Sequence, residues 1–141
     1  MIEYRTFGAE QTAAVCEIYQ VNQWSSYLGD TARIEKALAQ SLYTLGAFDG
    51  GRLVGFVRCV GDTEFILYVQ DVIVLPAYQR RGIGRELMRR TSEAFPAVRQ
   101  FLLITDKDDE ASNAFYRAIG MTKDMFAYPV NHYFRSNGKI G

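Results

Sequence analysis

A short basic turn that contains two glycines carries the clearest chemical signal in this sequence. Gly82 and Gly84 are separated by one residue, and the arginines Arg80, Arg81 and Arg85 stand beside them. Glycine lets a large anion approach the backbone closely because no Cβ stands in the way. The arginines add formal positive charge at the same place. The turn therefore predicts a binding site for a pyrophosphate or a similar anion.

A strand and a helix must position this turn. Residues 72–75 (Val-Ile-Val-Leu) are typical of a buried strand, and Pro76 ends it because proline has no N–H to donate to a ladder. After the turn the apolar residues recur at helical spacing: Ile83, Leu87, Met88, Thr91, Ala94 and Phe95. The first N–H groups of a helix lack partners within it, and the macrodipole places partial positive charge there. The predicted anion thus lies at the start of a helix that begins near Ile83.

Two other phosphate-binding loops do not fit this turn. A P-loop has four residues between its glycines and then Gly-Lys-Ser/Thr, whereas Arg85, Glu86 and Leu87 follow Gly84 here. A dinucleotide-binding fingerprint needs a third glycine three residues after the second, and that position is Leu87. Both assignments are therefore rejected.

The turn instead resembles the acyl-CoA loop of the GNAT N-acetyltransferase superfamily. The pattern of that loop is Gln/Arg-x-x-Gly-x-Gly/Ala after a strand that ends in Val-x-Pro. The sequence here is Gln79-Arg80-Arg81-Gly82-Ile83-Gly84 after Val74-Leu75-Pro76, and an amphipathic helix follows. The alternative interpretation is an ordinary strand–helix turn whose arginines are solvated.

The resemblance implies acetyl-CoA as the co-substrate. Its pyrophosphate would bind the backbone N–H groups of residues 80–85, and its pantetheine arm would pair with the preceding strand as an added strand. The residues expected to bind acetyl-CoA here are Val72, Val74, Gln79, Arg80, Arg81, Gly82, Ile83, Gly84 and Arg85. Arg89 and Arg90 are interpreted as a solvated helix face.

A second motif, residues 113–121 (Asn-Ala-Phe-Tyr-Arg-Ala-Ile-Gly-Met), also resembles this family. The resemblance implies Tyr116 as the general acid that protonates the leaving CoA thiolate, a role open to a neutral phenol. The alternative is a tyrosine that packs on a helix face. An asparagine near the start of this helix often binds the pantetheine arm in the family. Here the matching place is Asp109, and Asn113, one turn later, is expected to make that contact.

The acceptor of an N-acetyltransferase is an amine that must lose a proton before it attacks. The resemblance places a bulge near Gln70 and Asp71, which splays the strand and opens a slot for the acetyl group. A backbone N–H near Val72 would hold the oxyanion. Asp71 is the best candidate for the base or for binding the cationic amine, and a structural carboxylate is the alternative. Tyr68 or Glu64 acting through water is a further possibility.

Aromatic residues interrupt the helical pattern between the first two expected helices. Trp24 and Tyr27 lie in residues 22–29, which in this family line the acceptor site. Their rings could stack on the acceptor or make a cation–π contact with an amine, and capping of the core is the alternative. His132, the one histidine, is expected to have a surface or structural role. One histidine and two distant cysteines do not make a zinc site, so no metal is expected.

The sequence pattern predicts a mixed α/β fold with the order β-α-α-β-β-β-α-β-α-β-β, which is the GNAT topology. Asp49-Gly50 between two apolar runs indicates a hairpin, and residues 100–105 indicate a buried parallel strand. The last two strands are expected over residues 121–128 and 131–134. We expect one N-acetyltransferase domain over residues 1–141, with 135–141 as a frayed tail.

Composition limits the partners. The formal net charge is zero, so it gives no electrostatic case for nucleic acid or membrane binding. Cys16 and Cys59 lie in apolar segments, which indicates buried free thiols in a reducing compartment. The N-terminus has no basic-then-apolar leader, so a cytoplasmic location is expected. Small folds of this kind often form homodimers, but no residue marks one here.

The sequence thus predicts an enzyme that transfers the acetyl group of acetyl-CoA directly to a primary amine of a small molecule. Two alternatives stay open: a protein or peptide N-acetyltransferase, and a non-catalytic acyl-CoA sensor. The first differs from the small-molecule enzyme only in its acceptor groove, and the second would not need Tyr116.

Overall fold

The computed structural model describes residues 1–123, 130–135 and 140. The chain divides into two compact units, Met1–Ile104 and Thr105–Gly141, each of which is described by itself. The strands of the first unit are β1 (Ile2–Thr6), β2 (Tyr43–Asp49), β3 (Arg52–Gly61), β4 (Ile66–Val74) and β5 (Gln100–Leu103). Its helices are α1 (Thr12–Val21), α2 (Thr31–Gln40) and α3 (Ile83–Ala94), with short 3₁₀ turns η1 (Ala9–Gln11), η2 (Ser25–Tyr27) and η3 (Pro76–Tyr78).

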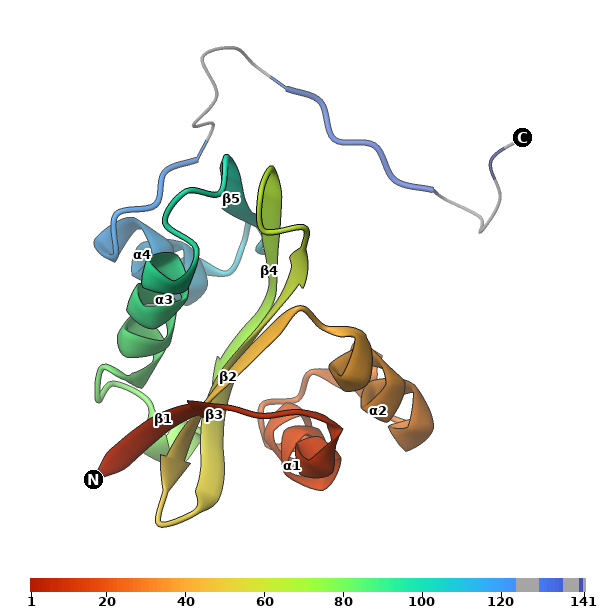
Figure 1. Ribbon diagram of the computed structural model, residues 1–141, viewed down its shortest axis with the longest axis vertical. Coiled ribbons are helices and arrows are strands. Elements are labelled where there is room, and N and C mark those ends of the chain that lie inside the picture. The colour runs from red at the N-terminus through yellow and green to blue at the C-terminus, as the bar shows by residue number, and fades with distance from the viewer. Residues whose placement is uncertain (124–129, 136–139, 141) are drawn as a thin grey trace. The chain divides into compact units, whose positions relative to one another are not determined.

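Among the described residues these strands form one five-stranded sheet in the order β1-β2-β3-β4-β5. The first three pairings are antiparallel, and β4 pairs with β5 in parallel, as the sequence predicted. Figure 1 shows α1 and α2 on one side of this sheet and α3 on the other. The connection from β4 to β5 runs through α3, and a helix is the usual way to join two parallel strands.

Local sequence signals explain where the elements begin and end. Asp30 caps α2 by accepting the Arg33 backbone N–H at 3.0 Å, as expected for an aspartate at this position. The hairpin between β2 and β3 turns through Gly50 (φ +56°) and Gly51 (φ +87°), which both have the positive φ of a type I′ turn.

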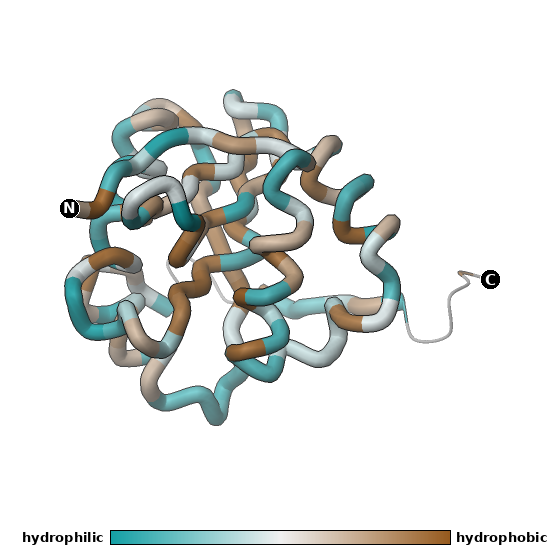
Figure 2. Tube along the Cα trace, turned by 90° about the horizontal axis from the view of Figure 1, so that it is seen from below, coloured by the Kyte–Doolittle hydropathy of each residue, from teal (hydrophilic) through white to brown (hydrophobic). Residues whose placement is uncertain are grey.

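The core lies between the sheet and its helices. Phe56 and Val57 of β3, Leu67 of β4 and Leu87 of α3 are fully buried. Burial of a side chain of this size contributes about 1.5–3 kcal/mol of transfer free energy. Figure 2 shows hydrophobic stretches running through the interior, while hydrophilic stretches are concentrated at turns and outer helix faces.

A bulge divides β4 into two halves, as predicted near Gln70 and Asp71. Arg58 of β3 pairs with Asp71, but the next residue, Cys59, pairs with Val69, so Gln70 is an extra residue on β4. The pairing of β4 with β5 covers Ile66 to Val69 and stops at the bulge. Beyond it, residues 70–74 keep β3 on one side and leave β5 on the other. We call this opening the β4–β5 fork.

The second unit contains α4 (Glu110–Ala118). Asp109 caps it by accepting the Ser112 backbone N–H at 3.0 Å, and Gly120 follows the helix at φ +96°; aspartate and glycine are residues that commonly begin and end a helix. The predicted strand over residues 121–128 falls largely outside the described residues. The one expected over residues 131–134 is not found, because residues 130–135 are exposed and carry no strand. A strand needs a neighbouring backbone to complete its ladder, and sequence pattern alone does not supply one.

Candidate active site

The glycine-containing turn has the backbone conformation of an anion-binding helix start. Gly82 caps α3 in the left-handed region (φ +81°), and a Cβ added there would meet no atom within 4 Å. Arg80 also has a positive φ of +63°, which is uncommon for a residue with a side chain. The first helical bond runs from the Glu86 N–H to the Gly82 carbonyl at 3.0 Å. The N–H groups from Ile83 to Arg85 therefore precede the first bond of the helix and have no partner within it.

The arginines of this region fall into two groups. Arg80, Arg81 and Arg85 are exposed around the turn, and the Arg81 guanidinium lies 5.0 Å from the Tyr78 ring centroid. The Tyr78 hydroxyl in turn donates to the Asp49 carboxylate at 2.6 Å, which ties the turn to the β2–β3 hairpin. These arginines lie close enough to the helix start to contact a polyanion bound there.

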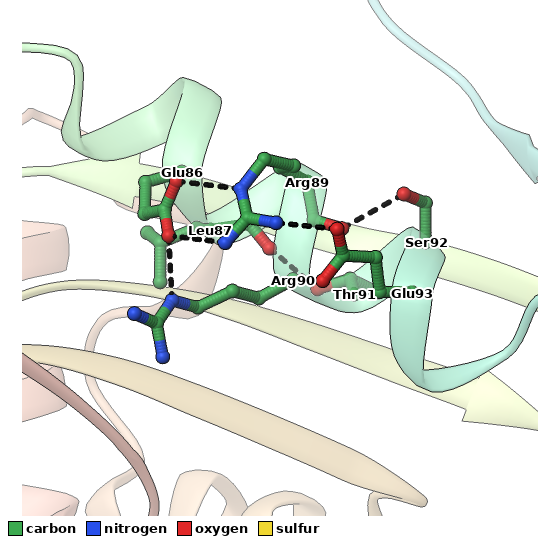
Figure 3. A network of polar contacts seen from close by, with 7 residues as sticks. All are labelled: Glu86, Leu87, Arg89, Arg90, Thr91, Ser92 and Glu93. Atoms are coloured by element: carbon green, nitrogen blue, oxygen red, sulfur yellow. Dashed lines mark hydrogen bonds and ion pairs between the residues drawn. The ribbon is translucent and has the colours of Figure 1, made fainter.

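Arg89 and Arg90 belong instead to a network along the surface of α3 (Figure 3). Both donate to Glu86, at 2.7–2.8 Å, and Arg89 also pairs with Glu93. The hydrogen bonds from Arg89 and Arg90 lower the pKa of Glu86 to about 2. Glu86 lies in the first turn of α3, so two arginines neutralise the one acidic group nearest the predicted anion. The interpretation of Arg89 and Arg90 as a solvated face is consistent with this network.

The backbone of β4 faces the fork at two residues. The Leu75 N–H donates to the Val54 carbonyl of β3 at 2.8 Å. Because backbone groups alternate along a strand, those of Val72 and Val74 point away from β3, toward the fork. The Val74 carbonyl accepts the side-chain amides of Gln79 at 3.0 Å and Asn22 at 3.3 Å. A pantetheine arm pairing here would therefore use the Val74 N–H or displace an amide.

Asp71, next to the bulge, lies at the centre of a buried polar cluster. Its side chain is fully shielded, and its Oδ2 accepts from the Arg58 Nε at 2.7 Å and from the Tyr19 hydroxyl at 2.6 Å. Its Oδ1 accepts from the Tyr27 hydroxyl, also at 2.6 Å. Gln70 donates its side-chain amide to the Tyr27 oxygen at 2.9 Å. We call Asp71, Arg58, Tyr19, Tyr27 and Gln70 the bulge cluster.

This environment is unfavourable for a base. Asp71 is 1% exposed, and both of its oxygens are occupied, so no acceptor amine can touch it as the cluster stands. The geometry favours the alternative, a carboxylate that holds its neighbours in place.

The two tyrosine rings of this cluster pack with a third aromatic ring, that of Trp24. Tyr19 and Tyr27 stack with centroids 4.2 Å apart and planes 6° apart. Trp24 lies nearly parallel to both, with its ring 6.0 Å from Tyr19 and 6.3 Å from Tyr27. Tyr19 is fully buried, whereas Trp24 and Tyr27 are half-buried. The two residues expected at the acceptor site therefore lie together and keep part of their surface open.

The phenols of this face hold their protons strongly. Burial, and then the charge of Asp71, raise the pKa of Tyr19 and of Tyr27 above the usual value. The pKa of Tyr68 is raised in the same way, and that of the Cys59 thiol rises to about 12 through burial. Phenols of this kind stay neutral across the physiological range, so they can hydrogen-bond but do not act as anionic bases.

Sequence reasoning missed Arg58, the partner of Asp71. Its signal was present: Arg58 is the one charged residue in the apolar run Leu53–Val60. A charged residue at such a position needs a partner of opposite charge. The neighbouring strand offers Asp71, so pairing the two strands in register would have found the contact.

In the second unit, Tyr116 and Asn113 lie on α4. The Tyr116 ring contacts that of Phe115 edge-on at 5.2 Å. The Asn113 amide donates to the backbone carbonyls of Asp106 at 2.9 Å and Asp109 at 2.7 Å, so it closes the loop before the helix. Asp109 is engaged as the helix cap, and its hydrogen bonds with Ser112 lower its pKa. The roles expected for Tyr116 and Asn113 toward acetyl-CoA stay predictions.

Within the described part of the chain, no three His, Cys, Asp or Glu side chains are grouped to hold a metal ion. Cys59 is buried as expected, but Cys16 is only half-buried, because α1 turns this residue toward its outer flank; both thiols are free.

Both the sequence and the fold match known acetyltransferases. The chain belongs to the acetyltransferase (GNAT) family, whose model matches residues 10–121. The fold has a solved counterpart in a GNAT family acetyltransferase, SP0256, from Streptococcus pneumoniae TIGR4. The two chains are 31% identical, the match covers 97% of this chain and 99% of that one, and the TM-score is 0.81.

Two relatives show how far the likeness extends. The chain is 30% identical over 129 residues to the chloroplastic GCN5-related N-acetyltransferase 1 of Arabidopsis thaliana, covering 87% of this chain and 65% of that protein. It is 38% identical over 82 residues to the N-alpha-acetyltransferase RimI of Mycobacterium tuberculosis, covering 56% of this chain and 51% of that protein. The chain thus spans between 48% and 65% of the length of the first curated relatives it matches.

Proposed function

We propose that this protein is an N-acetyltransferase that moves the acetyl group of acetyl-CoA directly to a primary amine of a small molecule. One observation carries the proposal: the open edge of β4 beyond the bulge leads through Pro76 into the left-handed Gly82 at the start of α3. An extended acyl-pantetheine arm can add to such an edge as a strand, and its diphosphate then reaches unpaired N–H groups.

The proposed reaction uses the fork as its slot. The neutral amine attacks the thioester carbonyl, and a backbone N–H near Val72 stabilises the oxyanion. The C–S bond then breaks, the leaving thiolate takes a proton from the Tyr116 hydroxyl, and water returns a proton to the Tyr116 oxygen. With Asp71 enclosed in the bulge cluster, the proton that the amine loses passes to water at the fork. We further propose that residues 1–141 act as one domain and that the two free thiols reflect a reducing, cytoplasmic setting.

A second candidate is transfer to the N-terminus of a peptide. The relative named N-alpha-acetyltransferase RimI, 38% identical over 82 residues, favours it. Such an acceptor would be held by its extended backbone rather than by one small pocket.

Thiol release with acetyl-CoA tests the proposal against a panel of polyamines, aminosugars, arylalkylamines and N-terminal peptides, with calorimetry of CoA binding alongside. We expect CoA binding and turnover with at least one small amine, and loss of turnover in Tyr116→Phe with CoA binding retained. Turnover with peptides alone would establish the second candidate. Tight CoA binding without any turnover would indicate an acyl-CoA sensor, and no CoA binding would refute the proposal.

A further inference from the structure

The hydroxyl of Tyr27 is held in one orientation. A phenol has one proton to donate and two lone pairs that accept. The proton of Tyr27 points inward to Oδ1 of Asp71 at 2.6 Å, and the oxygen accepts the Gln70 amide at 2.9 Å. It also accepts a longer hydrogen bond from the Arg58 Nη2, at 3.4 Å. What Tyr27 offers to an incoming molecule is therefore a hydrogen-bond acceptor.

The buried side of the cluster enforces this orientation. Arg58 forms an ion pair with Asp71 at 2.7 Å, and a hydrogen bond to a charged group is about twice as strong as one between neutral groups. Burial and the charge of Asp71 also raise the pKa of Tyr27, so the phenol keeps its proton. Donation to the carboxylate in turn makes the phenol oxygen a better acceptor, because hydrogen bonds in a chain polarise one another.

This acceptor atom lies at the fork. Of its two donors, Arg58 is buried, but Gln70 is the extra residue of the bulge and is exposed, so an N–H group from solvent can take the place of Gln70. The Tyr27 ring stacks on Tyr19 with centroids 4.2 Å apart, and the Arg58 guanidinium lies 5.9 Å from the Tyr27 centroid; part of the ring stays exposed beside these two neighbours. Trp24 adds a second half-buried ring 6.3 Å away.

The charge of the cluster limits the acceptor. Its one carboxylate, Asp71, is buried and paired with Arg58, so the cluster offers rings and a neutral oxygen but no free anion. A polyamine or an aminosugar carries several cations that would need carboxylates of their own. A single ammonium on an aromatic body matches what the cluster presents, since a ring attracts both a cation and another ring.

We propose that Tyr27 is a specificity-determining residue that selects an aromatic monoamine: its oxygen accepts an N–H of the amine in place of Gln70, and the aromatic body packs against Tyr27 and Trp24. Asp71 and Arg58 are positioning residues that keep the Tyr27 proton turned inward. This inference rests on the proposed function, because it concerns the acceptor of that reaction.

The chain supplies its own probe, since Trp24 is the one tryptophan in the sequence. Its fluorescence is followed while 2-phenylethylamine is added to the CoA-loaded protein. This amine does not absorb the light that excites tryptophan. Tyr27→Phe keeps the ring and removes the acceptor oxygen. Tyr19→Phe is the matched control, because it removes an equally short hydrogen bond to the same carboxylate from a ring that is 1% exposed.

We expect Tyr27→Phe to weaken phenylethylamine binding about tenfold, equivalent to roughly 1.4 kcal/mol. Tyr19→Phe should change it less than about twofold, although it lowers stability. The quaternary analogue, phenylethyl-trimethylammonium, has the same body and charge but no N–H, so it should bind wild type and Tyr27→Phe alike. Spermidine should bind more weakly than phenylethylamine. In turnover, Tyr27→Phe should raise the KM for the amine and leave the KM for acetyl-CoA unchanged.

Equal weakening by the two variants would reduce Tyr27 to a structural role and overturn the inference. So would unchanged binding in Tyr27→Phe, a preference for spermidine, or no saturable fluorescence change with any amine. The proposed function is judged separately, by thiol release. Amine binding with the expected pattern but no thiol release would refute the function and leave this acceptor site standing.

Discussion

Two of the arginine–carboxylate pairs in this molecule have the same separation and are expected to differ in their contribution to stability. Beside the bulge, Arg58 and Asp71 approach to 2.7 Å and are 8% and 1% exposed. On α3, Arg90 and Glu86 also approach to 2.7 Å, but their side chains are 43% and 28% exposed. Water competes with the second pair and is excluded from the first. The distance between two charged atoms therefore does not by itself show how much an ion pair contributes to stability. That contribution depends on whether water reaches the pair and on which groups fill the remaining hydrogen-bonding positions.

The sharpest test of this comparison removes the buried charge. Asp71→Asn leaves Arg58 buried without a counterion and takes a charged acceptor from two phenols. We expect a loss of about 3–5 kcal/mol in the free energy of unfolding, measured by urea denaturation. The double variant Arg58→Met, Asp71→Leu should recover part of that loss, because no unpaired charge remains. A cost below about 1 kcal/mol for Asp71→Asn would place the buried pair on a level with the surface pairs.

The second prediction concerns Tyr19. Loss of its hydroxyl in Tyr19→Phe should cost about 1.5–3 kcal/mol, the range for a hydrogen bond to a charged group. The pKa of Tyr19 is raised in the fold, by burial first and by Asp71 second. The stability that it contributes is therefore complete below the unfolded pKa of about 10 and is lost as the pH rises above it.

The urea midpoint at neutral and at alkaline pH checks both parts of this prediction. Wild type should lose more stability than Tyr19→Phe between about pH 8 and pH 11. Equal alkaline losses in the two proteins would mean that Tyr19 ionises as readily in the folded state as in the unfolded chain.

A third prediction moves to the exposed region, at the start of α3. Gly82→Val places a branched side chain at φ +81° and over the predicted diphosphate site. We expect about tenfold or greater loss of CoA affinity, or at least about 1.4 kcal/mol, by calorimetry. Gly51→Val is the matched control, since Gly51 has φ +87° and an added Cβ there also meets no atom. Both variants should lose about 1–2 kcal/mol of stability through backbone strain, but only Gly82→Val should lose CoA.

The smallest effect is expected at Glu86. Glu86→Gln removes the shared partner of Arg89 and Arg90, yet it should cost less than about 1 kcal/mol of stability, and high salt should erase the difference. The pKa of Glu86 is lowered to about 2, so its contribution is present above the unfolded pKa of about 4.3 and fades as the pH falls toward 2. A salt-independent cost comparable to that of Asp71→Asn would contradict the comparison between the two regions.

Local signals explain why the exposed region was predictable and the buried one was not. Residues 72–94 contain a strand, a proline, two glycines and a helix, and each can be identified from a few neighbouring residues. The structure places them as predicted. The bulge cluster is assembled from distant parts: Asp71 meets Arg58 across 13 residues, Tyr27 across 44 and Tyr19 across 52. An aspartate in a strand has the same appearance whether it will be a base or a bound counterion. Only its partners decide, and tertiary packing chooses them.

The bulge also explains why the fork and the buried cluster occur together. Successive side chains of a strand point to opposite faces of the sheet. The one inserted residue, Gln70, therefore exchanges the faces to which the side chains before it point, relative to the side chains after it. Removal of this residue would turn Leu67 and Val69 out of one hydrophobic layer, or Asp71 and Ile73 out of the other. The number of residues in β4 is therefore fixed, because one residue more or fewer would move side chains to the opposite face of the sheet. A family alignment that moved a gap across this position would assign residues to the wrong face.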